Sequence, residues 1–312
     1  MKKMKRDFIS LLDLSRDEIE NLFKHAKVLK EEVAAGKYRK TLAGRSLAMI
    51  FEKPSTRTRI SFEVGMTQLG GHSLYLSPAE TQIGRNEPLK DTARVISSYC
   101  DGIIIRTFEH EKVLELAKWS AAPVINALSD LQHPCQILSD MFTIIEHFGS
   151  LKGIRVAFIG DGNNVANSWV HAAGRMNIPL SLACPEGHDP DPRVLADAME
   201  GTGASIRVVR KPADAAKGAS VIYTDVWASM GQEHEEEERK KAFMSYRVDE
   251  ALLKLASPDA IIMHCLPAHR GEEITDEAVE GRQSVVFVQA ANRLHVQKAV
   301  LEWLLVPEKV SG

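Results

Sequence analysis

Residues 47–59, Leu-Ala-Met-Ile-Phe-Glu-Lys-Pro-Ser-Thr-Arg-Thr-Arg, join an apolar run directly to the start of a helix, which is the basic unit of an α/β fold. Pro54 ends the strand that the apolar run predicts, since proline cannot donate to a strand ladder. Ser55 and Thr56 are residue types that cap a helix. An apolar face at helical spacing follows at Phe62, Met66 and Leu69. The stretch therefore predicts one β-strand, a short turn and one α-helix.

The same alternation of apolar runs and amphipathic segments continues along the chain. Further strands are predicted at residues 73–76, 102–106, 124–126, 155–160, 180–184, 206–209, 221–225, 260–265 and 285–288. The clearest helix begins with a capping-box pattern, Ser15 to Glu18, and stops before Gly36. Helical patterns between most of the strands indicate βαβ units. We expect an α/β protein with two doubly wound domains, each a mostly parallel sheet flanked by helices.

One domain boundary is indicated near the middle of the chain. The pattern over residues 135–148 predicts a helix that stops at Gly149, and a new strand with its own glycine-rich turn follows. We therefore predict a first domain over residues 1–148 and a second over residues 149–289. The last helix, within about residues 290–312, is expected to pack back on the first domain.

Composition limits the class of protein. The 312 residues carry a net charge of -3, and 44% are hydrophobic and 26% charged, which is typical of a soluble globular protein. No overall positive field favours nucleic acid or an anionic membrane, so neither is expected as a partner. No apolar stretch approaches the length of a membrane span.

The cysteines and the N-terminus bear on the compartment. Four scattered cysteines without a CxxC pair indicate reduced thiols rather than a disulfide framework. They are Cys100, Cys135, Cys184 and Cys265. The basic N-terminus is followed by an apolar run, residues 8–12, that Ser10 interrupts and that is too short for the core of a signal peptide. We expect a cytoplasmic protein.

Polar side chains follow nearly every predicted strand. In open parallel sheets, ligands bind at the carboxyl ends of the strands. The donor-rich positions after the apolar runs are residues 55–58, Arg106, residues 133–136, 160–167, 225–231 and 264–267, and Arg293. This number of coincidences favours one shared cleft over seven unrelated loops.

The Ser-Thr-Arg-Thr sequence that opens the first quoted helix has the features of an anion site. A helix start offers free N–H groups and the positive end of the helix dipole. Three hydroxyls add donors, and an arginine adds a planar fork that suits phosphate. The residues are Ser55, Thr56, Arg57 and Thr58. A plain helix cap with surface arginines is the alternative, but Arg106 and Arg293, each just beyond a predicted buried strand, favour phosphate.

A second polar pair opens the helix predicted after residue 133. His133 and Gln136 lie one turn apart and could donate hydrogen bonds to a carbonyl oxygen, as in an oxyanion site. A lone histidine at such a place is more often a cap or a packed core residue, and this alternative stays open.

Three other patterns are better explained by a structural role than by a cofactor or metal site. Residues 160–165 resemble the start of a dinucleotide fingerprint, but Val165 occupies the third glycine position and no clean acid follows the next strand. His264, Cys265 and His269 lack companions at the spacing of a tetrahedral zinc site, so no metal is expected. The charged run 233–241 is interpreted as a solvated helix face.

Four motifs in order resemble those of the aspartate/ornithine carbamoyltransferase family, and the similarity runs from about Asp7 to Leu304. They are residues 51–63, residues 133–136 (His-Pro-Cys-Gln), residues 225–231 (Asp-Val-Trp-Ala-Ser-Met-Gly) and residues 264–267 (His-Cys-Leu-Pro). The cysteine at the third place of the second motif matches the ornithine form of the family, since the aspartate enzymes usually have threonine there.

The resemblance implies transfer of the carbamoyl group of carbamoyl phosphate to the δ-amine of L-ornithine, which gives citrulline and phosphate. It implies a carbamoyl-phosphate domain followed by an ornithine domain, homotrimers or multiples of trimers, and no cofactor or metal. It assigns the phosphate to Ser55, Thr56, Arg57, Thr58 and Arg106, with Gln82 reaching in from a neighbouring subunit. It assigns the carbonyl group to Arg57, Thr58, His133, Gln136 and Arg293. It assigns ornithine to Asn167, Asp225, Ser229 and Met230, and the place where the substrates meet to Cys265 and Leu266. Arg57, Arg106, His133 and Cys265 are the expected catalytic residues.

The mechanism expected from this chemistry is orientation plus electrostatic stabilisation, since carbamoyl phosphate is already activated. The acceptor of the amine proton is left open between phosphate oxygens and Cys265 with Asp225. Four alternatives also remain: a carbamoyltransferase for another amine such as putrescine or an acylated ornithine, an aspartate enzyme, a catalytically inactive regulatory paralogue, and a nicotinamide dehydrogenase.

Overall fold

The structure is a computed structural model that describes residues 5–77, 87–200, 202–228 and 236–306. The chain divides into two compact units. Unit 1 comprises Met1–Ser139 and Arg293–Gly312, and unit 2 comprises Asp140–Asn292. Two helices, α5 (Pro134–Phe148) and α12 (Val286–Leu305), contribute residues to both units. The sequence placed the boundary at the end of α5, whereas the compact units divide within this helix.

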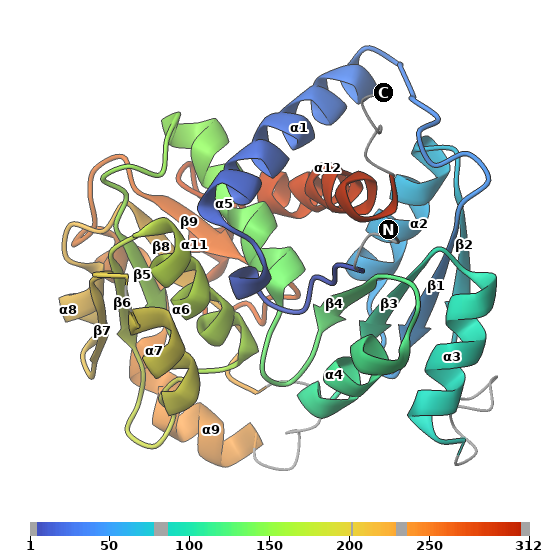
Figure 1. Ribbon diagram of the computed structural model, residues 1–312. Coiled ribbons are helices and arrows are strands. Elements are labelled where there is room, and N and C mark those ends of the chain that lie inside the picture. The colour runs from blue at the N-terminus through green and yellow to red at the C-terminus, as the bar shows by residue number, and fades with distance from the viewer. Residues whose placement is uncertain (1–4, 78–86, 201, 229–235, 307–312) are drawn as a thin grey trace. The chain divides into compact units, whose positions relative to one another are not determined.

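Unit 1 contains a four-stranded parallel sheet in the order β2-β1-β3-β4 (Figure 1). Its strands are β1 (Ser46–Phe51), β2 (His72–Leu76), β3 (Gly102–Arg106) and β4 (Val124–Leu128). Its other elements are the 3-10 turn η1 (Leu11–Asp13) and the helices α1 (Arg16–Ala34), α2 (Thr56–Gln68), α3 (Leu89–Tyr99) and α4 (His110–Trp119). Because the chain steps outward from β1 to β2 and then returns to β3, the strand order reverses between β1 and β3.

Helices cover both faces of this sheet. On one face, Ala48 and Ile103 belong to a buried apolar cluster with Ala93 of α3 and Val113 of α4. On the other, Gly102 leaves room for Leu305 of α12, whose side chain lies 2.9 Å from where a Cβ would stand. The sheet is therefore doubly wound, as the alternation of patterns predicts.

Unit 2 contains a five-stranded parallel sheet in the order β7-β6-β5-β8-β9. Its strands are β5 (Val156–Ile159), β6 (Leu180–Ala183), β7 (Ile206–Val209), β8 (Val221–Thr224) and β9 (Ile261–His264). Its other elements are α6 (Asn164–Met176), α7 (Pro192–Met199), α8 (Pro212–Ala216), α9 (Glu236–Phe243), the 3-10 turn η4 (Met244–Tyr246), α10 (Glu250–Leu253) and α11 (Asp276–Glu280). Here the strand order reverses between β5 and β8.

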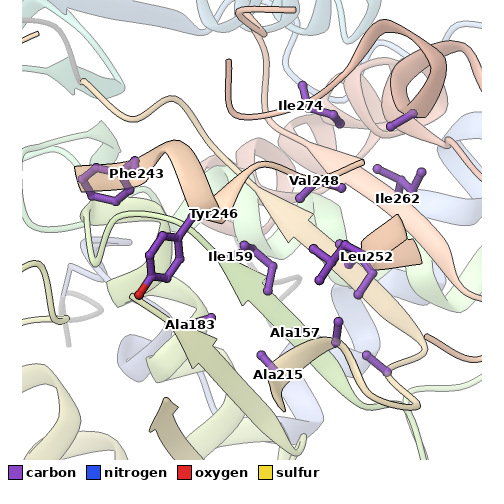
Figure 2. Packing of buried hydrophobic residues seen from close by; sticks show 14 of the residues in the cluster. Ala157, Ile159, Ala183, Ala215, Phe243, Tyr246, Val248, Leu252, Ile262 and Ile274 are labelled. Atoms are coloured by element: carbon purple, nitrogen blue, oxygen red, sulfur yellow. The ribbon is translucent and has the colours of Figure 1, made fainter. Parts of the chain in front are cut away.

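The core of unit 2 is built from alternate strand residues. Figure 2 shows Ile159 and Ile262 of the sheet packed with Phe243, Tyr246 and Leu252 from the helical layer on one face. On the other face, residues between these positions carry aromatic rings. Phe158 stacks on Tyr223 at 5.7 Å, and Trp169 of α6 meets Tyr223 edge-on at 5.6 Å.

The local signals for helix starts are confirmed. Ser15 accepts a hydrogen bond from Glu18 N, and Glu18 Oε2 accepts one from Ser15 N, which completes the predicted capping box. Ser55 caps α2 by accepting from Thr58 N at 3.2 Å. No helix in the described part of the chain is long and apolar enough to cross a membrane.

One predicted strand is wrong. The run 285–288 is β-branched and aromatic, yet α12 begins at Val286. Only Ser284 forms a parallel bridge, to Ile262, and Val285 donates to Ile262 O at 3.0 Å. The carbonyl of Val285 then accepts from Gln289 N at 2.8 Å, which starts the helix. Pairing thus stops after one bridge, and tertiary context overrides the strand propensity of the run.

Candidate functional site

The residues that the sequence predicts for an anion site in unit 1 lie where its strand order reverses. β1 and β3 pair so that Phe51 lies opposite Arg106, and both strands end at this point. Glu52 N donates to Arg106 O at 2.8 Å, and the Glu52 carboxylate accepts from Lys112 at 3.2 Å and from the hydroxyl of Thr107. These bonds fix the two strand ends together. Ligands of open parallel sheets bind at such reversals, beyond the carboxyl ends of the strands.

Arg293 joins the start of α2 to the start of α5. Its Nη2 donates to Thr58 Oγ1 at 3.0 Å, and its Nη1 donates to Gln136 Oε1 at 2.7 Å. All three side chains are buried. Arg293 reaches this place from two turns inside α12, not from the end of a strand as the sequence suggested. The structure brings together three of the five residues that the resemblance assigned to a carbonyl group.

His133 lies in the field of three arginines. It is 4% exposed, and burial together with the positive charges of Arg293, Arg106 and Arg57 holds its pKa well below the ordinary value of 6.5. The imidazole is therefore neutral at physiological pH and has one N–H to donate. A neutral donor among fixed cations suits an oxygen that gains negative charge during a reaction.

Cys135, between His133 and Gln136, has a structural role. Its thiol donates to Asn126 O at 3.4 Å, and burial raises its pKa to about 12. The thiol stays protonated and helps fix α5 against β4.

The polar residues of unit 2 gather where its strand order reverses, between β5 and β8. Asp225 follows β8 and is 6% exposed. Its Oδ2 accepts from Asn163 Nδ2 at 2.8 Å, and its Oδ1 accepts from Cys265 Sγ at 3.0 Å. Asn163 is also the N-cap of α6, so one side chain fixes both the helix and the carboxylate. Asn167 lies one turn further along α6, with its Oδ1 accepting from Asp191 N at 3.0 Å.

The turn after β9 is held by His264. Its Nδ1 accepts from Leu266 N at 2.8 Å, so Nε2 carries the proton and donates to Glu273 Oε1 at 3.1 Å. Leu266 has a φ of +59°, in the left-handed region that leucine rarely adopts. Ligand atoms of His264, Asp225 and Cys265 lie within 4.8 Å of one another, but hydrogen bonds to protein groups account for this grouping.

Arg239 anchors the segment that follows Asp225. It is 7% exposed, its Nε donates to Trp227 O at 2.6 Å, and its Nη2 pairs with Asp161 Oδ2. The interpretation of residues 233–241 as a solvated face is therefore wrong for Arg239, although Glu237 and Lys241 are exposed. One residue of a charged run became buried because Asp161 offers it a carboxylate.

Two further features, the glycine-rich turn after β5 and a cavity in unit 1, are poor candidates for a binding site. In the glycine-rich turn after β5, Asn163 Oδ1 accepts hydrogen bonds from the N–H groups of Val165 and Ala166. The backbone of Asp189 fills the space beside Gly162. A cavity of about 500 Å³ in unit 1 lies between α1 and α12. Its charges are already paired, since the Glu302 carboxylate contacts His25 and Thr41 and lies 4.0 Å from Arg39, so it is a weak candidate for a site.

Those predicted site residues that the structure describes fall into one group in each unit. Unit 1 holds Ser55, Thr56, Arg57, Thr58, Arg106, His133, Gln136 and Arg293, and unit 2 holds Asn167, Asp225, Cys265 and Leu266. Gln82, Ser229 and Met230 lie outside the described residues. The sequence missed Asn163 as the partner of Asp225, although an asparagine after a strand and before a helix is a recognisable cap.

Two parallel sheets flanked by helices, with an arginine-rich polar group and a neutral histidine in unit 1 and a carboxylate–thiol pair in unit 2, fit an α/β transferase. The family model of the aspartate/ornithine carbamoyltransferase carbamoyl-P binding domain matches residues 6–146, and that of the Asp/Orn binding domain matches residues 152–304. The chain belongs to the aspartate/ornithine carbamoyltransferase family.

Individual relatives agree. The chain is 51% identical over 302 residues to an ornithine carbamoyltransferase of Geobacter sulfurreducens, with 97% of this chain and 100% of the relative covered. It is 53% identical over 303 residues to that of Archaeoglobus fulgidus, with 97% and 98% covered. The solved ornithine carbamoyltransferase from Pyrococcus furiosus superimposes with a TM-score of 0.91 at 49% identity, covering 96% of this chain and 97% of that one.

Proposed function

We propose that this protein transfers the carbamoyl group of carbamoyl phosphate to the δ-amine of L-ornithine and releases citrulline and phosphate. The proposal rests on the side chains around Arg293. Arg293 donates to Thr58 and Gln136, and it lies with Arg106 and Arg57 close enough to the neutral His133 to lower its pKa. Relatives about half identical over nearly the whole chain are ornithine carbamoyltransferases. No observation favours another amine, aspartate, a nicotinamide cofactor or an inactive paralogue.

Unit 1 binds carbamoyl phosphate in this proposal. The start of α2 and the guanidinium groups of Arg57 and Arg106 hold the phosphate, because free N–H groups and planar cations match its oxygens. Ser55, Thr56 and Thr58 add hydroxyl donors, and Gln82 completes the site from a neighbouring subunit. His133, with Arg57 and Thr58, donates to the carbonyl oxygen. Gln136 and Arg293 lie beside this oxygen and keep the donors in place.

Unit 2 binds ornithine. Asp225 offers a buried carboxylate to the α-ammonium group, and its place is fixed by Asn163. Asn167, Ser229 and Met230 complete the amino-acid site. Cys265 and Leu266 line the place where the two substrates meet, so they also contact the carbamoyl group.

The reaction is an acyl transfer. The neutral δ-nitrogen attacks the carbonyl carbon, the new N–C bond forms, and the carbonyl oxygen gains negative charge that the unit 1 donors stabilise. The C–O bond to phosphate then breaks, and phosphate leaves with both electrons of that bond. The thiol of Cys265 already donates to Asp225, so Asp225 can accept the amine proton either directly or through Cys265. A phosphate oxygen is the competing acceptor.

We propose further that the functional particle is a trimer or a multiple of trimers. β2 is an edge strand, and its Leu74 and the Ile60 and Val64 side chains of α2 are exposed. Exposed apolar side chains and the edge of a sheet each favour association. We place the protein in the cytoplasm, in arginine and citrulline metabolism, with a carbamoyl-phosphate domain at residues 1–148 and an ornithine domain at residues 149–289. Light scattering of the purified protein tests the trimer, and a monomer at micromolar concentration would contradict it.

A steady-state assay tests the activity. Ureido product is measured with carbamoyl phosphate and, in parallel, ornithine, putrescine, acetylornithine and aspartate. We expect turnover with ornithine and at most traces with the others. Asp225→Asn removes the carboxylate that the α-ammonium group needs and should raise the KM for ornithine. Turnover with putrescine at the rate of ornithine would contradict the amino-acid site, and no turnover with any amine would indicate an inactive paralogue.

A further inference from the structure

The carboxamide of Gln297 lies between Arg293 and Ser61. Gln297 is fully buried on α12, one turn after Arg293. In the amide orientation that satisfies its neighbours, its oxygen accepts from Arg293 Nε at 3.0 Å and from Nη2 at 2.8 Å. Its nitrogen donates to Ser61 Oγ at 2.5 Å. The opposite orientation would point the NH₂ group at a guanidinium that has only donors.

The hydrogen bonds around Gln297 run in one direction. Ser61 accepts from Gln297, so its own proton goes to Arg57 O, which lies 2.6 Å away. Arg293 donates to Gln297 with Nε and, with its two Nη groups, to Thr58 and Gln136. One amide therefore fixes both the plane of Arg293 and the first turn of α2, where Arg57 and Thr58 lie.

We propose that Gln297 is a positioning residue for the carbonyl-binding side chains. It sets the orientation of the Arg293 guanidinium, and through Arg293 the positions of Thr58 and Gln136. The inference rests on the proposed function for its catalytic consequence, although the geometry of Arg293 can be tested without catalysis. Nothing in the sequence pattern singles out this residue, because a glutamine in an amphipathic helix is ordinary.

A purely structural role is the competing explanation, since Gln297 also links α12 to α2. The chain contains a matched control for it. Gln68 of α2 accepts from Lys298 of α12 at 2.9 Å and lies at the far end of α2, away from Thr58. Gln68→Met and Gln297→Met each remove one glutamine-mediated link between these two helices, but only Gln297→Met releases Arg293.

The first experiment compares these two variants. We expect Gln297→Met to lower kcat by about 10- to 100-fold, because a charge-assisted hydrogen bond is lost from a residue that holds the donors in place. The KM for ornithine should stay near that of the wild type, and Gln68→Met should keep the wild-type kcat. A wild-type kcat in Gln297→Met, or an equal loss in both variants, would overturn the proposal.

The second experiment does not need turnover. Gln297→Glu keeps the size of the side chain but places a carboxylate against Arg293, whose charge helps to depress the pKa of His133. NMR titration of the His133 ring should therefore show protonation at higher pH in Gln297→Glu than in the wild type, and calorimetry should show weaker binding of inorganic phosphate. An unchanged His133 titration would show that Gln297 does not contact Arg293. Because neither measurement depends on citrulline formation, a failure of the proposed function would leave this result interpretable.

Discussion

Replacing His133 by glutamine should change how the free energy of unfolding depends on pH. In the folded protein the pKa of His133 lies well below 6.5, because of burial and then the charges of Arg293, Arg106 and Arg57. In the unfolded chain it returns to about 6.5. Below pH 6.5 the unfolded chain therefore binds a proton that the folded protein does not bind, and the protein loses stability as the pH falls.

The size of this effect follows from proton linkage. One proton contributes at most about 1.4 kcal/mol per pH unit, so wild type should lose up to about 2 kcal/mol between pH 6.5 and pH 5 because of this histidine alone. Above about pH 7 the contribution is present almost in full and changes little. Glutamine has no such ionisation, so the stability difference between wild type and His133→Gln should shift by up to about 2 kcal/mol over that interval and stay nearly flat from pH 7 to pH 8.

The assay is urea denaturation of both proteins at matched concentration and a series of pH values, followed by intrinsic tryptophan fluorescence, to which Trp119 and Trp303 of unit 1 contribute. Taking the difference between the two proteins removes the contributions of the other titrating groups. His110→Gln is a useful companion, since burial lowers the pKa of His110 as well and its slope should have the same sign. A wild-type minus His133→Gln difference that is constant from pH 5 to pH 8 would refute the argument that His133 is neutral in the folded state.

Three further predictions concern Arg57, the Arg239–Asp161 ion pair and the amine of ornithine. Arg57→Ala should lower turnover by about 10²–10³ with little change in Tm, because one preorganised charge stabiliser is lost; near-normal turnover in the ureido assay would remove Arg57 from the mechanism. Arg239→Met should destabilise unit 2 by about 3–5 kcal/mol, since the buried Asp161 carboxylate loses its arginine partner and is left with His188, 3.7 Å away. Urea titration should show partial recovery in the double variant with Asp161→Asn, and additive losses would exclude the coupling. For the wild type, kcat/KM for ornithine should rise with pH through the neutral range, because only the scarce neutral δ-amine is a nucleophile; a flat profile would show that amine deprotonation does not limit the reaction.

The features that the sequence predicted correctly depend on local signals. Ser15 with Glu18 and the cap at Ser55 are short-range patterns whose hydrogen bonds involve residues three positions apart. The parallel sheets follow from the alternation of apolar runs with helical patterns. The residues of α2 that are proposed to bind phosphate were selected in the same way, because a strand, a proline and a hydroxyl-rich helix start stand next to one another in the chain.

The features that the sequence missed depend on partners far apart in the chain. Gln297 meets Ser61, and Arg239 meets Asp161, only because separate helices and strands pack against one another. No periodicity within α9 or α12 marks these positions. Arg293 was selected as a residue beyond a strand, but it belongs to a helix, so the structural reason for selecting it was wrong.

Leu266 illustrates how two demands on one position can conflict. A leucine at a φ of +59° costs about 1–2 kcal/mol relative to an ordinary backbone conformation, and glycine would avoid this cost. Selection for thermal tolerance alone would therefore favour glycine at position 266. Selection for turnover would retain the leucine, whose side chain is proposed to line the meeting place of the substrates. In a laboratory evolution experiment, the two pressures should drive this position in opposite directions.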